Sequence, residues 1–242
     1  LVHVSLMPGQ APRAAPHAAR ASPAMRSTPK VPYRHKGTEF TSWMGIYDRM
    51  YRERILFVNQ EIDDNFANQM ISVFLYLESE DATKPVALYC NSPGGLLKSG
   101  MALYDTMRIM PFDIQTVNMG LNGDIAAFLV GAGTKGKRYS LPNARFSMRS
   151  PGIEPARDGE GRRVQRMVQA TEMKLEVEEV LRDKARMIER LASFTGRPEE
   201  AIRADFERDF YLDAPEALEY GLIDKILQPK TPEKKRLWQA GD

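Results

Sequence analysis

Apolar residues recur along the chain with two spacings, which predict an alternation of strands and helices. Short apolar runs at residues 55–58, 86–90 and 114–119 have the length of strands, and the second is apolar on both faces, as in a strand covered on both sides. Between the first two runs, apolar residues three and four positions apart predict a helix with one buried face: Phe66, Met70, Ile71, Phe74 and Leu77. This order predicts parallel strand pairing with right-handed crossovers in an α/β fold.

The second half of the chain continues the alternation and contains one unusually long helical pattern. Helices are expected over residues 100–110 and 125–132, and short strands in "KRYSL" and "RFSM". A long helix is expected over 164–194, closed by Gly196, with Pro198 beginning the next helix. Its length exceeds that of an ordinary helix in a compact domain, so either part of it projects onto a partner or it lies wholly within the core. A last short helix ends at Gly221, before a strand over 222–226.

The two ends of the chain differ in composition from its centre. Residues 1–38 are rich in Ala, Pro, Ser and basic side chains and have no acid before Glu39, which is typical of an organelle transit segment; a disordered basic tail is the alternative. Residues 228–242 are expected to be loosely ordered. The sequence therefore predicts one folded domain over 39–227.

Charge and cysteine content exclude several classes of protein. The chain has 34 basic and 32 acidic side chains, a formal net charge of +2, with the excess in the first forty residues, so nucleic acid is not an expected partner. Cys90, the single cysteine, lies in an apolar run and is expected to be buried, which excludes an intrachain disulfide and a Cys-rich metal site. No apolar run approaches the ~20 residues that cross a bilayer, so no membrane partner is expected either.

The placement of histidine restricts the chemistry further. The three histidines, His3, His17 and His35, all lie in the transit-like head, and residues 36–242 contain none. A catalytic Ser or Cys is usually activated by an imidazole, so the folded part cannot form a His-dependent dyad or triad. It also lacks imidazole ligands for zinc. We therefore expect no metal and no cofactor.

Other catalytic motifs receive little support. The segment "NSPGG" is followed by Leu96 and Leu97 where a phosphate loop needs a lysine. A serine–lysine dyad of Ser92 or Ser99 with Lys98 is conceivable, but neither serine is predicted on a sharp strand-to-helix turn. Such a turn is predicted at "GLNGDIAA", where Asp124 is expected to cap the following helix.

Four segments resemble the proteolytic subunit of the Clp protease, ClpP. They are "YDRMYRERILFV", "NSPGGLLKSGMALYDTM", "AAFLVGAGTKGKRYSLPNAR" and "ERDFYLDAPEALEYGLIDKI", and the similarity extends over residues 45–227. The resemblance implies a ClpP/crotonase-like spiral of ββα units, with the long helix as a protruding handle through which two seven-membered rings stack. The polar loop "EPARDGEGRR" replaces the Gly-rich strand of the family between Arg149 and this helix.

The same resemblance assigns the catalytic positions. In the family, the turn that is "GLNGDIAA" here has a serine nucleophile where this chain has Asp124, and the histidine base corresponds to Arg149. The triad aspartate corresponds to Asp209, and the two oxyanion-hole amides correspond to Gly95 and Ile125. The chain is thus similar to the catalytically degenerate ClpR subunits of plastids and cyanobacteria. An Asp124–Arg149 ion pair, extended to Asp209, is a plausible filling of the site, since buried charges need partners.

The resemblance also implies partners and a location. ClpP-like and ClpR-like subunits are the expected ring neighbours, and a hexameric ATP-dependent chaperone of the ClpC type is expected to dock on apolar side chains that correspond to Tyr89, Val117, Tyr139 and Leu141. Together with the head segment, this implies the chloroplast stroma. The alternative is a crotonase-like acyl-CoA enzyme with Asp124 as general acid or base, because ClpP shares its spiral with those enzymes.

Overall fold

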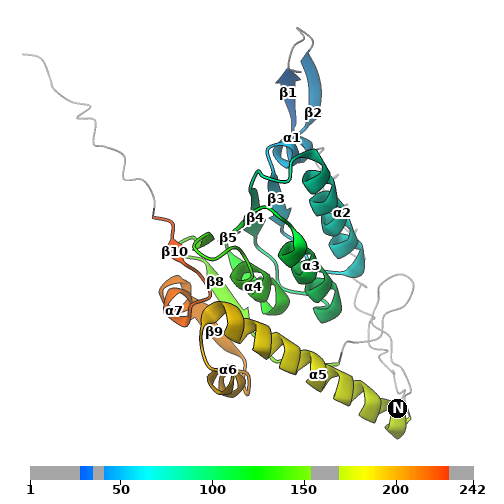
Figure 1. Cartoon of the computed structure of the whole chain (residues 1–242), viewed down its shortest axis with the longest axis vertical. Coiled ribbons are helices and arrows are strands. Elements are labelled where there is room, and N and C mark those ends of the chain that lie inside the picture. The colour runs from blue at the N-terminus through cyan, green and yellow to red at the C-terminus, as the bar shows by residue number, and fades with distance from the viewer. Residues whose placement is uncertain (1–27, 35–40, 154–168, 229–242) are drawn as a thin grey trace, which may run out of the picture. The chain divides into compact units, whose positions relative to one another are not determined.

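The computed structural model describes residues 28–34, 41–153 and 169–228, in two compact units divided between Arg49 and Met50. The smaller unit holds a hairpin of two antiparallel strands, β1 (Lys30–Arg34) and β2 (Thr41–Gly45) (Figure 1). The guanidinium of Arg49 lies 5.3 Å from the ring centroid of Tyr33. Strand β1 falls inside the segment 1–38, for which the sequence predicted a transit segment or, as the alternative, a disordered basic tail. Residues 30–34 form a strand because they pair with residues beyond that boundary.

The larger unit is built on a five-stranded parallel sheet in the order β10-β7-β5-β4-β3. Its strands are β3 (Ile55–Val58), β4 (Val86–Cys90), β5 (Ile114–Asn118), β7 (Arg138–Ser140) and β10 (Lys225–Ile226). The predicted parallel pairing and the first three strands are confirmed. The last strand begins three residues later than predicted, because Leu222 and Ile223 are buried in the core instead of pairing in the ladder.

Three helices follow the strands and pack beside one another on the sheet: α2 (Asp64–Glu80), α3 (Leu97–Ile109) and α4 (Asp124–Gly131) (Figure 1). The predicted apolar face of α2 is buried at four of its five residues, and Ile71 is only partly buried. Helices α3 and α4 approach closely at Gly100, where an added Cβ would lie 2.1 Å from the side chain of Ile125. A glycine is therefore needed at this contact.

A second sheet of three strands stands at the end of β5 and carries the candidate site. It consists of β6 (Leu121–Gly123), β8 (Arg145–Met148) and β9 (Phe210–Asp213), with β6 parallel and β9 antiparallel to β8. The ring of Phe128 on α4 makes edge contacts with Tyr104 and Phe194, at centroid distances of 5.0 and 5.3 Å. These contacts join α4 to α3 and to the long helix α5.

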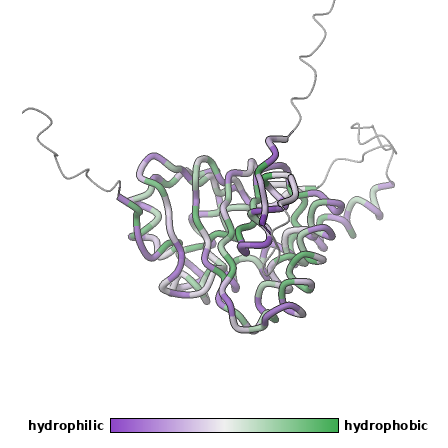
Figure 2. Tube along the Cα trace, turned by 90° about the horizontal axis from the view of Figure 1, so that it is seen from above, coloured by the Kyte–Doolittle hydropathy of each residue, from purple (hydrophilic) through white to green (hydrophobic). Residues whose placement is uncertain are grey.

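Helix α5 (Ala170–Thr195) occupies most of the predicted long helix, and residues 164–168 of that prediction lie outside the described residues. Gly196 ends it in the left-handed conformation, φ 78°, as predicted. The buried residues of α5 lie in its C-terminal half: Met187, Ile188 and Leu191. Its N-terminal half exposes apolar side chains (Figure 2 shows the hydropathy along the chain): Met173, Leu175, Val177 and Leu181. The first part of α5 therefore projects from this chain's own core.

The C-terminal elements α6 (Glu199–Asp205) and α7 (Ala214–Tyr220) complete the larger unit, and α1 (Ile46–Arg52) crosses the division between the units. Gly221 ends α7 with φ 84°, as predicted. Within the described ranges, no helix is long and apolar enough to span a membrane. Nor do the described residues form a group of three His, Cys, Asp or Glu side chains that could hold a metal ion.

Candidate functional site

The turn between β6 and α4 has the backbone shape that exposes a catalytic side chain. Asp124 begins α4 with φ 47°, a left-handed conformation that costs a non-glycine residue about 1 kcal/mol. An added Cβ on the preceding Gly123 would lie 2.3 Å from the backbone oxygen of Pro93, so the turn is pressed against the "NSPGG" loop. A strand, a sharp turn and a helix in this order form the elbow on which hydrolases place a nucleophile.

The side chain of Asp124 forms an ion pair with Arg149 and does not cap its helix. Gly123 is the N-cap residue of α4 and forms no side-chain capping bond, so the predicted capping role is wrong. Arg149 donates from Nε to Oδ1 of Asp124 at 2.9 Å and from Nη2 to Oδ2 at 2.7 Å. Two parallel bonds of this kind are the favoured geometry between a guanidinium and a carboxylate. The Asp124–Arg149 pair inferred from the sequence is therefore present.

The Asp124–Arg149 pair differs from the expected one in two respects: it is more exposed, and Asp209 forms no hydrogen bond with it. The Arg149 side chain is 50% exposed and that of Asp124 29%, so the charges are partly hydrated rather than buried. The hydrogen bonds and the charge of Asp124, with smaller contributions from Asp209 and Tyr211, raise the pKa of Arg149 above its ordinary value. Asp209 thus acts on Arg149 through its charge, while the side-chain bonds of Arg149 within the described residues go to Asp124.

The "NSPGG" loop is held rigidly on the other side of the site. Gly94 and Gly95 have φ angles of 108° and 157°, and Gly95 pairs with Ile62 as an isolated parallel bridge. The backbone N–H of Ile62 donates to the oxygen of Gly94, and that of Leu96 donates to the oxygen of Ile62, both at 2.8 Å. An added Cβ on Gly95 would lie 2.2 Å from the oxygen of Ile62, so only glycine fits here.

The two serines considered for a serine–lysine dyad have other bonds. Ser92 is fully buried, and its hydroxyl donates to the backbone oxygen of Gln60 at 2.6 Å. Ser99 is also buried, and its hydroxyl donates to the carboxylate of Asp64. Both hydroxyls therefore serve structural bonds, and neither residue lies on the elbow.

A cavity of about 120 Å³ brings four of the predicted site residues together: Gly95, Asp124, Ile125 and Arg149. The other wall of this cavity, which includes Leu97 at the start of α3 and Met187 on α5, was not predicted from the sequence. Met187 lies beside Ile188 and one turn before Leu191 on the buried face of α5. Asp209 does not line this cavity.

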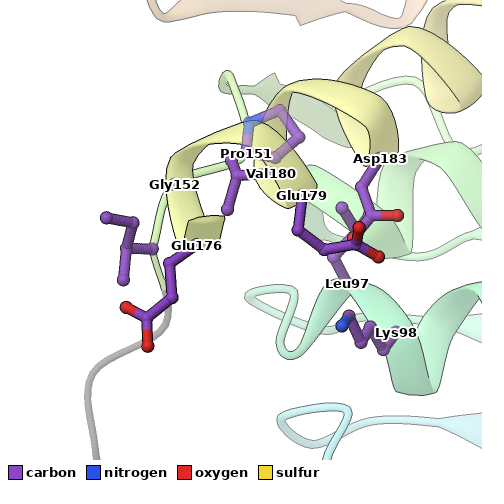
Figure 3. A pocket seen from close by; sticks show the side chains of 9 residues that line it. Leu97, Lys98, Pro151, Gly152, Glu176, Glu179, Val180 and Asp183 are labelled. Carbon is purple, nitrogen blue, oxygen red and sulfur yellow. The ribbon is translucent and has the colours of Figure 1, made fainter. Parts of the chain in front are cut away.

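A neighbouring cavity of about 190 Å³ shares Leu97, Pro151 and Gly152 with the first. Figure 3 shows its two helical walls, with Glu176, Glu179, Val180 and Asp183 projecting from α5 and Leu97 and Lys98 from α3. Its apolar members were also not predicted. The two cavities extend from the ion pair along the space between α3 and α5.

The four predicted docking residues lie on and beside one row of the parallel sheet. Tyr89 pairs in register with Val117, and Val117 with Tyr139. Tyr89 and Tyr139 are partly buried, and Leu141 is 37% exposed. Val117 is only 1% exposed, so it offers no docking surface of its own, and the prediction for this residue is wrong.

Cys90 plays no part in the site. It is buried at the end of β4, as predicted, and burial raises the pKa of its thiol to about 12. A thiol with such a pKa is protonated at neutral pH and unreactive.

The fold and the site together define the class of the protein. It is an α/β protein with the strand–turn–helix elbow and the glycine loop of a hydrolase, and the Asp124–Arg149 ion pair occupies the elbow. The family described as Clp protease matches residues 36–230, and the chain belongs to this family. The expected ClpP-like fold is thereby confirmed.

Curated relatives agree with this assignment. The chain is 44% identical over 200 residues to ATP-dependent Clp protease proteolytic subunit 2 of Prochlorococcus marinus (strain NATL2A), which covers 83% of this chain and 95% of the relative. It is 42% identical over 204 residues to ATP-dependent Clp protease proteolytic subunit 3 of Synechococcus sp. (strain CC9902), with 84% and 97% covered. Members of this family form oligomeric rings with Clp ATPases. The acyl-CoA enzyme considered as an alternative is not favoured.

Proposed function

We propose that this chain is a non-catalytic, ClpR-type ring subunit that assembles with active ClpP-type subunits in the proteolytic core of an ATP-dependent Clp protease. One observation carries the proposal: Arg149 and Asp124 form a bidentate ion pair at the elbow. Both side chains that would perform acyl transfer are then engaged with each other.

The chemistry of the two residues supports this proposal. A serine protease needs a hydroxyl that becomes an alkoxide and a base that takes its proton. The carboxylate of Asp124 is a poor nucleophile toward a peptide carbonyl, and the guanidinium of Arg149 does not release a proton at physiological pH. The raised pKa of Arg149 strengthens the second point. No histidine follows residue 35 in the sequence, so no other imidazole from the folded part of the chain can replace the base.

The remaining frame suits a peptide-lining role. Gly95 and Ile125 still line the cavity beside the ion pair, and the cavities between α3 and α5 continue from it. In the proposed role, this surface contributes to the wall of a proteolytic chamber whose cleavage is performed by neighbouring subunits.

The proposed partners follow from the ring assembly of the family. Active ClpP-type chains and other ClpR-type chains would be ring neighbours in a stacked double ring. A ClpC-type ATPase would dock on the apolar row of the sheet, where Tyr89, Tyr139 and Leu141 are accessible. We further propose the chloroplast stroma as its location, on the basis of the basic, acid-free composition of residues 1–38.

The proposal is tested by labelling with a fluorophosphonate, which reacts only with an activated serine. The assembly is purified from its native source through a tag on this chain, labelled, and resolved subunit by subunit. We expect this chain to remain unlabelled while co-purifying subunits react. Labelling of this chain would show an active nucleophile and would contradict the proposal.

A further inference from the structure

A groove between helices α3 and α5 continues away from the ion pair at the elbow. It combines the cavity of about 190 Å³ shown in Figure 3 with a second cavity of about 560 Å³, which follows the C-terminal half of α5. The two cavities are continuous, because they share four lining residues: Leu97, Lys98, Glu179 and Asp183. We call the combined space the α3–α5 groove.

One face of each helix forms a wall of the α3–α5 groove. Three residues of α3, Leu97, Met101 and Ala102, give their wall an apolar surface, and Val180 adds to it from α5. The lining residues of α5 recur at helical spacing, so they share one side of the helix: Glu176, Glu179, Val180, Asp183, Arg186 and Arg190. The groove is therefore apolar in part and has charged side chains along its length.

The charges are ordered along the α5 wall. Its three acidic residues come first, at 176, 179 and 183, and its two arginines follow, at 186 and 190. On the α3 wall, Lys98 lines both cavities, and Asp105 lines the second cavity together with the arginines. The first end thus has three acids and one lysine, and the other end has two arginines and one aspartate. One end of the groove is negative, and the other is positive.

The two arginines keep donors for a ligand. Their side chains are 63% exposed at Arg186 and 50% exposed at Arg190. Arg186 pairs with Asp183 at 3.3 Å, and Arg190 pairs with Glu189 at 3.8 Å. A guanidinium has five N–H donors, so one contact of this kind leaves most of them available. Exposed pairs contribute little to stability, so a competing carboxylate can displace them at low cost.

We propose that the α3–α5 groove binds a short peptide with two free ends, its ammonium group among the acids and its carboxylate at Arg186 and Arg190. Such a peptide carries one charge at each end and uncharged backbone between, which complements the order of charges in the groove. A guanidinium is also the favoured partner of a carboxylate. Peptides with free ends are products of proteolysis, so the inference rests on the proposed function for the source of the ligand, but not on the absence of catalysis in this chain.

The length of the groove limits the length of the peptide. Glu176 and Arg190 are separated by about 21 Å along α5, at ~1.5 Å per residue. An extended peptide advances ~3.3 Å per residue, so about six or seven residues span the two charged ends. A longer chain cannot place both of its ends in the groove at once. The groove therefore favours short products over unfolded protein.

Photocrosslinking of a short peptide tests the proposal. The assembly is purified through a tag on this chain, and its active serines are blocked with diisopropyl fluorophosphate. A hexapeptide of alternating alanine and photo-leucine, with free ends, is then added and irradiated. We expect crosslinks on α3 and α5 of this chain. Acetylation of the amino end or amidation of the carboxyl end should each reduce them about tenfold, because each removes a charge that the groove binds.

Substitution of the two arginines locates the carboxylate. The double variant Arg186→Gln and Arg190→Gln should reduce crosslinking of the free peptide about tenfold and leave that of the amidated peptide unchanged. Arg203→Gln, at an exposed position of α6, is the matched control and should crosslink as the wild type does. Equal melting temperatures show that the variants are folded.

The outcomes separate this inference from the proposed function. A lack of crosslinks on α3 and α5 would overturn the groove as a binding site, and so would equal crosslinking of free and end-blocked peptides. The comparison of peptides uses the wild-type chain, so it does not depend on the folding of any variant. Fluorophosphonate labelling of the untreated assembly reports on catalytic silence whichever result is obtained.

Discussion

The conformation of residue 124 is compatible with two different side-chain roles. Its φ of 47° belongs to a turn fixed by the contact of Gly123 with the backbone of Pro93, so the backbone, and not the side chain, sets the shape of the elbow. Aspartate is among the few residues that tolerate this region. A hydrolase-like elbow is therefore retained although its side chain now accepts hydrogen bonds from Arg149.

Paired substitutions measure whether this ion pair contributes to stability. We expect Asp124→Asn and Arg149→Gln each to lower the free energy of unfolding, and the double variant to lose less than the sum, with a coupling of about 0.5–1 kcal/mol, as for exposed pairs. Asparagine also tolerates positive φ, so the backbone term stays constant. Urea unfolding of the four proteins gives the coupling, and strictly additive losses would show that the pair does not form in solution.

At the level of single residues, the sequence predicted contacts better than burial. The family pattern placed an acid and a base at two facing positions, and opposite charges at facing positions attract, so the pair was predictable. Its exposure depended on how far α5 and residues 150–153 close over it, which is a matter of tertiary packing. The docking role of Val117 failed for the same reason, because the sequence does not show whether an apolar residue on a strand is buried or exposed.

At the scale of the elements, the buried guanidinium of Arg138 connects strand β7 to the carboxyl ends of helices α4 and α5. Arg138 on β7 donates to the backbone oxygen of Gly131, at the end of α4, and to that of Phe194, near the end of α5. It also pairs with Asp224, Nη2 to Oδ1, at 2.6 Å, with side-chain exposures of 4% for Arg138 and 18% for Asp224. Since the carbonyl ends of helices carry partial negative charge, a cation at this point stabilises both helices.

Removal of the carboxylate should therefore be costly. We expect Asp224→Asn to lower the free energy of unfolding by about 3 kcal/mol, because the charge of Arg138 would remain buried without its partner. Chemical denaturation at pH 7 measures this loss. Asp113→Asn is the control, since Asp113 pairs with Lys137 on the surface at 2.7 Å and such exposed pairs contribute about 0.5 kcal/mol. Equal losses for the two variants would contradict this account of Arg138.

The same pair predicts a dependence on acid. Burial raises the pKa of Asp224, but hydrogen bonds from Arg138 and from the backbone of Gly136 and Arg138 outweigh it, so the pKa is lowered. A lowered pKa in the folded state gives stability that is complete above the unfolded value near 4 and is lost as the pH falls below it. Between pH 5 and pH 3, wild type should lose more unfolding free energy than Asp224→Asn. A larger loss for the variant would contradict the assigned direction.

Elements with a clear apolar pattern were predictable, including the short strands in "KRYSL" and "RFSM", which are β7 and β8. The strands at 55–58 and 86–90 and the helix over 64–80 carry enough apolar residues at fixed spacing to be read directly. Strand β6 is only the tripeptide "LNG", which has turn composition and becomes a strand because β8 pairs with it. Strand β1 lies in a basic segment and depends in the same way on β2. Pairing of short strands is decided by tertiary contacts, which one sequence does not display.

For the molecule as a whole, helix α5 divides into two halves that differ in burial. Its C-terminal half contributes Met187, Ile188 and Leu191 to the core. Its N-terminal half contributes no buried residue and exposes Leu175 and Leu181, at 65% and 58%. Apolar side chains exposed together on a projecting helix are typical of an assembly surface. The sequence left open whether the helix projects, and the distribution of burial favours projection.

Substitutions in the N-terminal half of α5 should impair assembly, whereas a substitution in its C-terminal half should lower the stability of the chain itself. We expect the double variant Leu175→Ser and Leu181→Ser to keep the unfolding free energy of the chain within about 0.5 kcal/mol, because both side chains are already exposed. This double variant should form less of the assembly, or none, as measured by native mass spectrometry. Leu191→Ser, in the core, should destabilise the chain by about 3 kcal/mol or more. Thermal melting and native mass spectrometry measure both effects; normal assembly of the double variant would contradict an assembly role for this half of α5.

The buried state of Cys90 has a practical consequence for spectroscopy. It is the single cysteine of the chain, fully enclosed, with a thiol whose pKa is raised to about 12, so thiol-directed dyes and spin labels should leave it untouched at neutral pH. A cysteine introduced at Tyr76, whose side chain on α2 is 63% exposed, would then be the one reactive thiol, without removal of the native one. Distances between such labels on successive copies would give the geometry of a ring directly.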